Sequence, residues 1–121
     1  LSRGLGDVYK RQPTSFAPIT DVAKEVAALA NANGGDADLH SAAAWENVMI
    51  IKRVIEAVGV TGDPANIEKE RLAVRNGLEA LETTEGLIGQ ITRVQDEGEA
   101  LKPYVFVQAQ AGNWTVIHDP R

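Results

Sequence analysis

The sequence predicts an α/β fold in which three helices are followed by a short strand and a β-hairpin. Apolar residues recur at steps of three and four up to about residue 81, as on the buried face of a helix. Beyond Gly86 they alternate every second position, as in strands. Gly34-Gly35 and Asp63-Pro64 divide the first part into three segments. The order of elements is therefore helix, helix, helix, strand, hairpin.

The first helix is expected to begin at Thr20 or Asp21, because either side chain can accept hydrogen bonds from the free N–H groups of a first turn. It should end before Gly34-Gly35, since glycine readily adopts the left-handed conformation after a helix. Residues 1–18 show no sustained period and are predicted to be a loose lead-in.

The second helix, from about residue 41 to 58, is the most apolar segment. Five of its residues follow steps of four and three and are expected to face the core: Ala44, Val48, Ile51, Ile55 and Val58. Glu46 and Arg53 are assigned to the opposite, solvated face, and Trp45 is expected in the core. So much apolar surface predicts that this helix packs against a sheet.

The third helix is expected to start at Asp63-Pro64, a capping residue followed by proline at the first helical position. It runs to about residue 81, and Gly77 inside it costs roughly 1 kcal/mol relative to Ala. The glycines of Gly86-Leu87-Ile88-Gly89 are expected to end this helix and turn the chain into a strand. Strands are predicted at residues 89–94, 104–108 and 114–117, the last two forming a hairpin.

Composition excludes several functions. The net charge is −5, and the body beyond residue 12 is more acidic still, because Arg3, Lys10 and Arg11 outnumber Asp7 in the lead. An acidic chain is a poor partner for nucleic acid, whose binding requires many Lys and Arg contacts. No cysteine is present, so disulfides and thiolate sites are excluded.

No catalytic motif is found, and the chain is predicted not to be an enzyme. Its two histidines, His40 and His118, are far apart and lack the neighbouring ligands of a metal site, so neither a metal nor a cofactor is expected. The carboxylates of Asp96-Glu97 with Glu99 lack the spacing of a calcium loop and are interpreted as a solvated turn. Trp114, like Trp45, is expected to pack in the core.

Asp7-Val8-Tyr9-Lys10-Arg11-Gln12 resembles a translated sequencing-adapter string. Residues 1–12 are therefore interpreted as a non-native, adapter-derived lead and set aside from the fold. Residues 13–121 are expected to be the C-terminal portion of a longer substrate-binding domain. The heavily apolar second helix agrees with this interpretation, because three late strands offer it too little cover.

A series of short motifs resembles the C-terminal region of type I periplasmic binding proteins, specifically the branched-chain amino acid (Leu/Ile/Val-binding-protein-like) group of ABC transporters. The resemblance covers residues 40–117. In chain order, the matching segments are Trp45-Glu46-Asn47-Val48, Ala57-Val58-Gly59, Asp63-Pro64, Glu85-Gly86-Leu87-Ile88-Gly89-Gln90-Ile91, Asp96-Glu97-Gly98-Glu99, Lys102-Pro103-Tyr104-Val105 and Gly112-Asn113-Trp114-Thr115-Val116.

The resemblance implies two α/β lobes that close on a small amino-acid-like ligand, after which the closed form docks on an ABC permease. It implies a periplasmic monomer and a parallel sheet under the second helix. Residues 13–85 would supply helices of one lobe, and residues 86–121 would supply the hinge crossover and a hairpin of the other. The chain alone is not expected to be ligand-competent.

One site residue follows from the resemblance. The residue just before the long apolar helix commonly presents an aromatic ring to the ligand cleft, and here that residue is His40. The change to histidine puts branched-chain specificity in doubt and makes a polar or acidic ligand plausible, because imidazole can donate a hydrogen bond to a carboxylate.

Two alternatives remain open. A ligand-sensing regulatory domain of the same fold would lack the cleavable signal peptide of an importer component. A small freestanding helical interaction domain would instead use the apolar helix to contact a partner protein, and would melt cooperatively on its own.

Overall fold

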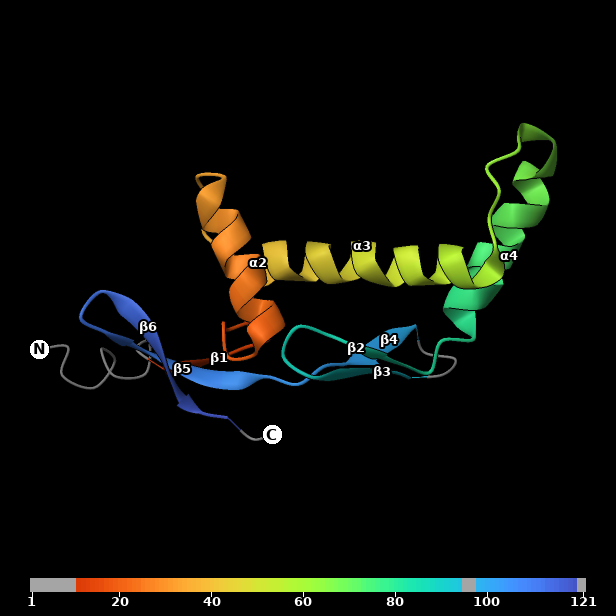
Figure 1. The fold of residues 1–121 in the computed structure, drawn as a ribbon. Helices are drawn as coiled ribbons and strands as arrows, with labels where there is room; N and C mark the ends of the chain where they lie inside the picture. Colours follow the sequence, from red (N-terminus) through yellow and green to blue (C-terminus); the bar gives the residue numbers. More distant parts are fainter. Residues whose placement is uncertain (1–10, 95–97, 120–121) are drawn as a thin grey trace, which may run out of the picture.

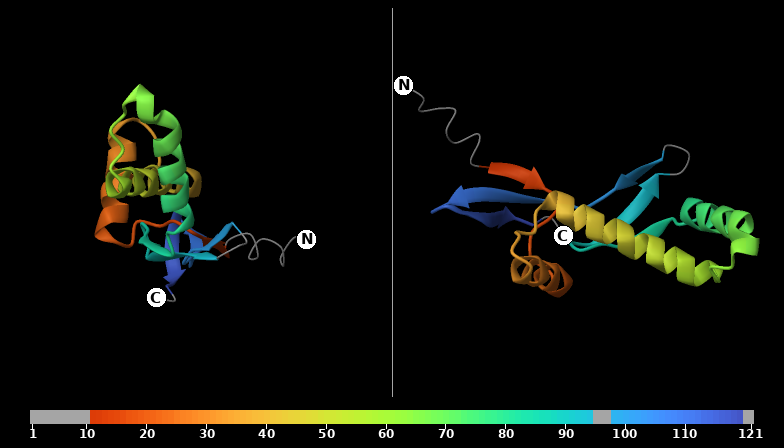
Figure 2. Two further views of the ribbon diagram at one scale, coloured as in Figure 1. Left: turned by 90° about the vertical axis from the view of Figure 1, so that its right-hand side faces the viewer. Right: turned by 90° about the horizontal axis from the view of Figure 1, so that it is seen from above.

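The computed structural model describes residues 11–94 and 98–119. In this part of the chain, three α-helices lie on one side and two small antiparallel sheets lie on the other (Figure 1). Two further views show α4 beside the C-terminal end of α3, with the β5–β6 hairpin at the opposite end of the molecule (Figure 2). The predicted mixture of helices and strands is confirmed.

The three predicted helices are present as α2 (Asp21–Ala32), α3 (Leu39–Val58) and α4 (Ile67–Glu79), the last preceded by a 3-10 turn, η1 (Pro64–Asn66). Thr20 caps α2, since its Oγ1 accepts a hydrogen bond from the backbone N–H of Ala23 at 3.1 Å. Asp38 and Ser41 form a reciprocal capping box at the start of α3. None of the helices in the described residues is long and apolar enough to cross a bilayer.

The strands form two separate sheets. The first has the order β1 (Arg11–Thr14), β5 (Val105–Gln110), β6 (Asn113–His118), and the second has the order β2 (Thr83–Glu85), β3 (Gln90–Val94), β4 (Glu99–Leu101). The predicted strand at 89–94 and the predicted hairpin are confirmed. The hairpin turns through Ala111 and Gly112, which both have positive φ, as a two-residue primed turn requires.

Three strands were not expected from the sequence. β1 lies in the segment predicted to be a loose lead-in, so that prediction is wrong for residues 11–14, and β1 begins inside the stretch set aside as adapter-derived. β2 and β4 are each three residues long, too short to reveal a period of two. β1 pairs with β5, which is distant in sequence, whereas β2 and β4 both pair with β3, which lies between them in the chain. Every described pairing is antiparallel, so the parallel sheet implied by the resemblance is not among them.

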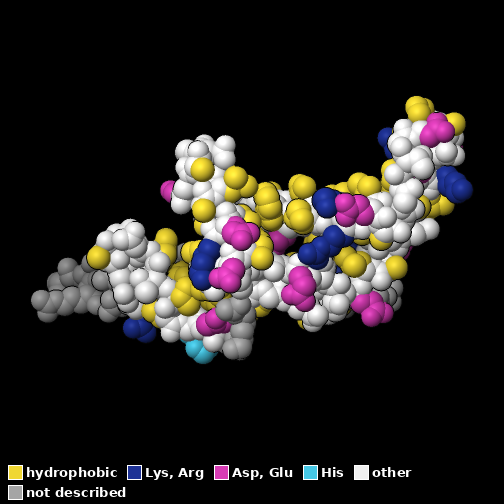
Figure 3. Space-filling view, viewed as in Figure 1, with side chains coloured by type: hydrophobic (Ala, Val, Ile, Leu, Met, Phe, Trp, Pro, Cys, Tyr) yellow, Lys and Arg dark blue, Asp and Glu magenta, His cyan; other side chains and the backbone are white. Residues whose placement is uncertain are grey.

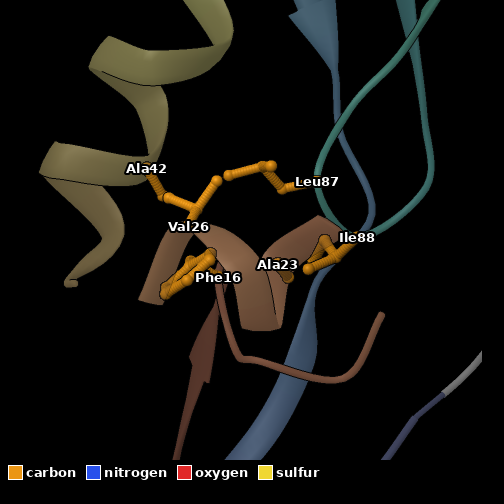
Figure 4. Close-up of a cluster of buried hydrophobic side chains, with 6 residues drawn as sticks. All are labelled: Phe16, Ala23, Val26, Ala42, Leu87 and Ile88. Carbon is orange, nitrogen blue, oxygen red and sulfur yellow. The ribbon is translucent and has the colours of Figure 1, made fainter. Parts of the chain in front are cut away.

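The buried side chains form two small clusters. The larger joins α2, the start of α3 and the turn at residues 86–89 (Figure 4): Phe16, Ala23, Val26, Ala42, Leu87 and Ile88. The smaller packs Ala17 against Val105 and Val107 of β5. Ile19 lies against both clusters, and it thereby links the helical layer to the first sheet.

The apolar stripe of α3 does not face this core, contrary to the sequence prediction. We call its five residues the α3 stripe: Ala44, Val48, Ile51, Ile55 and Val58. All five are exposed, with the four larger side chains between 36% and 64% accessible, and apolar atoms run along the upper edge of α3 (Figure 3). The opposite face of α3 carries its buried residues, Ala42, Glu46 and Val54. Ala42 belongs to the larger cluster, and Val54 lies against Gly77 of α4.

Gly77 allows α4 to approach α3 closely. A Cβ atom at this position would lie 2.7 Å from Cγ1 of Val54 and 3.1 Å from Cγ1 of Val58, which is inside van der Waals contact. Val54 is buried and its branched side chain has little rotational freedom. Glycine at position 77 therefore lowers the helix propensity of α4 but is needed for the close packing of α3 and α4.

This packing predicts that Gly77→Ala destabilises the chain. The substitution gains roughly 1 kcal/mol of helix propensity but forces a methyl group into Val54, and overpacking of this kind costs about 1–3 kcal/mol. We expect a net loss of roughly 1 kcal/mol in chemical denaturation. Asn76→Ala, at a neighbouring exposed position of the same helix, should be neutral or stabilising. Equal stabilisation by both substitutions would contradict the close approach.

Candidate functional site

His40, the site residue implied by the resemblance, lies in the first turn of α3 and is exposed. Its backbone N–H donates a hydrogen bond to Oδ1 of Asp38 at 3.1 Å. The other histidine, His118, ends β6 and places its ring 5.9 Å from the ring of Phe106. Within residues 11–94 and 98–119, no group of three His, Cys, Asp or Glu side chains could hold a metal ion.

An apolar groove of about 490 Å³ opens beside the start of α3. We call it the Trp114 groove. One wall comes from the segment between β1 and α2, a second from the α2–α3 connection, and the third from β5 and β6. Its lining residues are Gln12, Thr14, Phe16, Ala17, Pro18, Ile19, Asp36, Ala37, Asp38, Leu39, Val107, Trp114 and Val116. The volume lies in the usual range for small-molecule sites.

The groove lies close to His40 in sequence, although His40 does not line it. Asp38 and Leu39, the two preceding residues, do. Trp114 is 56% exposed, so the prediction that it packs in the core is wrong, because β6 is an edge strand whose Trp114 side chain lines an open groove. Trp45 is also exposed and lies with α2 residues around a smaller hollow of about 180 Å³.

Asp38 carries a fixed negative charge at the edge of the groove. The backbone N–H of Ser41 at 2.7 Å and its hydroxyl at 2.9 Å donate to Oδ1 of Asp38 and hold the pKa of this carboxyl below its ordinary value. The charge and N–H of His40 act in the same direction. Asp38 therefore stays ionised at neutral pH while it caps α3.

A second apolar hollow, of about 410 Å³, lies between the end of α3 and α4. Its polar edge is structural, because Glu70 accepts hydrogen bonds from the hydroxyl of Thr61 at 2.5 Å and from the backbone N–H of Thr61 at 2.9 Å. These bonds, with a further N–H from Gly62, lower the pKa of Glu70. They hold the 61–62 loop against α4.

Glu46 is buried, contrary to its predicted place on the solvated face of α3: only 6% of it is accessible. Its Oε1 accepts a hydrogen bond from the backbone N–H of Leu87 at 2.7 Å, and its Oε2 forms an ion pair with the ammonium group of Lys102. Lys102 lies in the connection between β4 and β5. One carboxylate thus ties α3 to the 86–89 turn and to the segment that joins the two sheets.

Both backbone polar groups of Leu87 form hydrogen bonds with side chains. Its N–H is bound by Glu46, and its carbonyl accepts a hydrogen bond from the Thr20 hydroxyl, which also caps α2, at 2.5 Å. Gly86 permits this arrangement, since a Cβ there would lie 2.8 Å from Oε1 of Glu46. The predicted turn at residues 86–89 is present and closes with a Gly86 N–H to Gly89 carbonyl bond of 2.9 Å, but it joins β2 to β3 and does not end a helix.

Sequence reasoning missed both the groove and the buried ion pair. Glu46 and Lys102 both lie in segments that carry the family resemblance, yet nothing in their spacing indicates that they meet. Asp96 and Glu97, interpreted as a solvated turn, lie outside the described residues.

Comparison with known protein families, curated proteins and solved structures finds no match to this chain. Its function therefore has to be argued from the residues and their geometry.

The buried ion pair predicts that Glu46→Gln is strongly destabilising. Glutamine can still accept from Leu87, but Lys102 loses its counter-ion, and leaving a mostly buried charge uncompensated costs about 2–4 kcal/mol. Chemical denaturation measures this loss. The matched control is Glu56→Gln on the same helix, where Glu56 forms an exposed ion pair with Lys52 and the loss should stay below about 0.5 kcal/mol. Similar losses for the two variants would contradict a special role for Glu46.

Proposed function

We propose that this chain forms part of a two-lobed solute-binding protein of an ABC importer, which binds a small amino-acid-like molecule without chemical turnover and delivers it to a membrane permease. The observation that carries the proposal is the two-faced character of α3. One face carries the buried residues Ala42, Glu46 and Val54, and the opposite face presents the exposed α3 stripe. A helix that is buried on one face and apolar on the other is suited to burial between two layers.

The position of the Trp114 groove gives further support, with the carboxylate of the ligand left to contacts outside the groove such as His40. The groove opens at the N-terminal end of α3 and is lined by Asp38 and Leu39, immediately before the residue that the resemblance assigns to the ligand cleft. Lys102 supports the proposed hinge crossover, because it lies between the two sheets and is fixed to α3 by Glu46. A ligand that contacts both lobes would favour the closed state by its higher affinity for that state.

The α3 stripe provides a direct test, because a chain without cysteine can carry a single thiol label. We expect Ile51→Cys to react quickly with a thiol reagent in the 121-residue chain. In a protein that contains the rest of the proposed lobe, the same thiol should be protected at least tenfold. Lys52→Cys is the control, since its exposed neighbour position should react at the same rate in both proteins.

The outcomes separate the proposal from the interaction-domain alternative. The steps of four and three in the α3 stripe also match the seam of a coiled coil, so a freestanding interaction domain would self-associate through it. Protection of Ile51→Cys that rises with the concentration of the 121-residue chain would favour that alternative. Equal reactivity in the short and long proteins would contradict burial against a second layer.

His40 is the ligand-contact residue under this proposal. In the two-lobed protein, His40→Ala should weaken ligand binding more than tenfold, which corresponds to about 1.4 kcal/mol, as measured by calorimetry. An unchanged affinity would show that His40 is a surface residue of the first helical turn and does not contact the ligand. Ligand-dependent uptake into a permease-containing vesicle would distinguish an importer component from a sensor of the same fold, for which no uptake would occur.

A further inference from the structure

The Trp114 groove has walls that suit an apolar ligand body. Nine of its lining residues are apolar, and they come from three separate parts of the chain: Phe16, Ala17, Pro18, Ile19, Ala37, Leu39, Val107, Trp114 and Val116. Trp114 and Leu39 remain substantially exposed, so a ligand that covered them would remove apolar surface from water and gain free energy.

The charge of the groove has one sign. Among the residues that the structure describes, Asp36 and Asp38 are its charged lining residues, and no Lys or Arg side chain lines it. Asp38 is kept ionised by its bonds from Ser41. Asp36 is exposed and makes no hydrogen bond or ion pair with the described residues, so its carboxylate is open to a ligand.

The indole ring of Trp114 offers a large apolar wall for the body of the ligand. The net charge of the chain, −5, also favours the approach of cations over anions. A carboxylate in the groove would meet no cationic side chain among the described lining residues, and an unpaired charge removed from water is costly.

We propose that the Trp114 groove binds a primary amine with an apolar body and discriminates against ligands that carry a carboxylate. The ammonium group lies at the Asp36–Asp38 edge, and the apolar body lies against Trp114 and the sheet. This selectivity belongs to the groove itself and goes beyond the importer role. It also gives a chemical reason for the expectation that the chain alone binds no amino acid.

Three probes that share one phenyl ring and differ in their charges test the proposal on the 121-residue chain. They are 2-phenylethylamine, phenylalanine and 3-phenylpropionate, titrated into a chain whose dispersed amide NMR spectrum shows that it is folded. We expect 2-phenylethylamine to shift amide signals of residues 36–39 and Trp114 saturably, with at least tenfold higher affinity than the other two. Equal affinities, tighter binding of the carboxylate, or no binding by the folded chain would overturn the proposal.

Variants locate the site. Asp36→Asn should weaken 2-phenylethylamine binding at least fivefold without lowering the melting temperature, because Asp36 has no described partner to lose. Trp114→Leu, which keeps an apolar wall, should also weaken binding. Glu25→Gln, at an exposed acid of α2 outside the groove, should leave affinity unchanged. If Asp36→Asn did not change the affinity for 2-phenylethylamine, the proposal for the groove would be wrong. The importer role is tested separately, by the labelling of Ile51→Cys.

Discussion

The carboxylate of Glu46 joins three parts of this protein: α3, the 86–89 turn and the connection between the two sheets. It accepts the N–H of Leu87 and pairs with Lys102, while the Leu87 carbonyl binds the cap of α2 through Thr20. A short turn thereby fixes the starts of two helices and the connection between two sheets. The apolar clusters of the described residues are small, and these polar bonds act beside them. Such bonds favour one arrangement of the helices and sheets, because a buried polar or charged group that loses its partner costs free energy.

The rest of the molecule follows from this arrangement. With Glu46 directed at the turn, α3 must present its opposite face outward, and the α3 stripe is left uncovered. The same placement brings the α2–α3 connection over the first sheet, where Asp36 and Asp38 border an apolar groove. The uncovered stripe and the acidic groove, on which the proposed function and the proposed ligand class depend, therefore share one structural origin.

Local patterns predicted the local structure well. The capping residues Thr20 and Asp63, the period of four and three, and the Ala111-Gly112 turn located three helices and a hairpin. They could not locate β1, which pairs with the distant strand β5, or β2 and β4, which are too short to show a period of two. They also placed α3 the wrong way round, because periodicity shows that a helix has an apolar face but not which neighbour it meets. The ion pair between Glu46 and Lys102 and the groove wall formed by Trp114 are products of tertiary packing and leave no signal in spacing.

The central claim, that Glu46 and Thr20 fix the Leu87 peptide in the core, is tested most directly by amide hydrogen exchange of Leu87 in the unmodified chain. A buried N–H bound to a carboxylate exchanges only when the surrounding structure opens. We predict that the Leu87 amide is as strongly protected as the amides of Val105 and Val107 in β5. Exchange of Leu87 at the rate of an exposed loop amide, with the β5 amides still protected, would contradict the account.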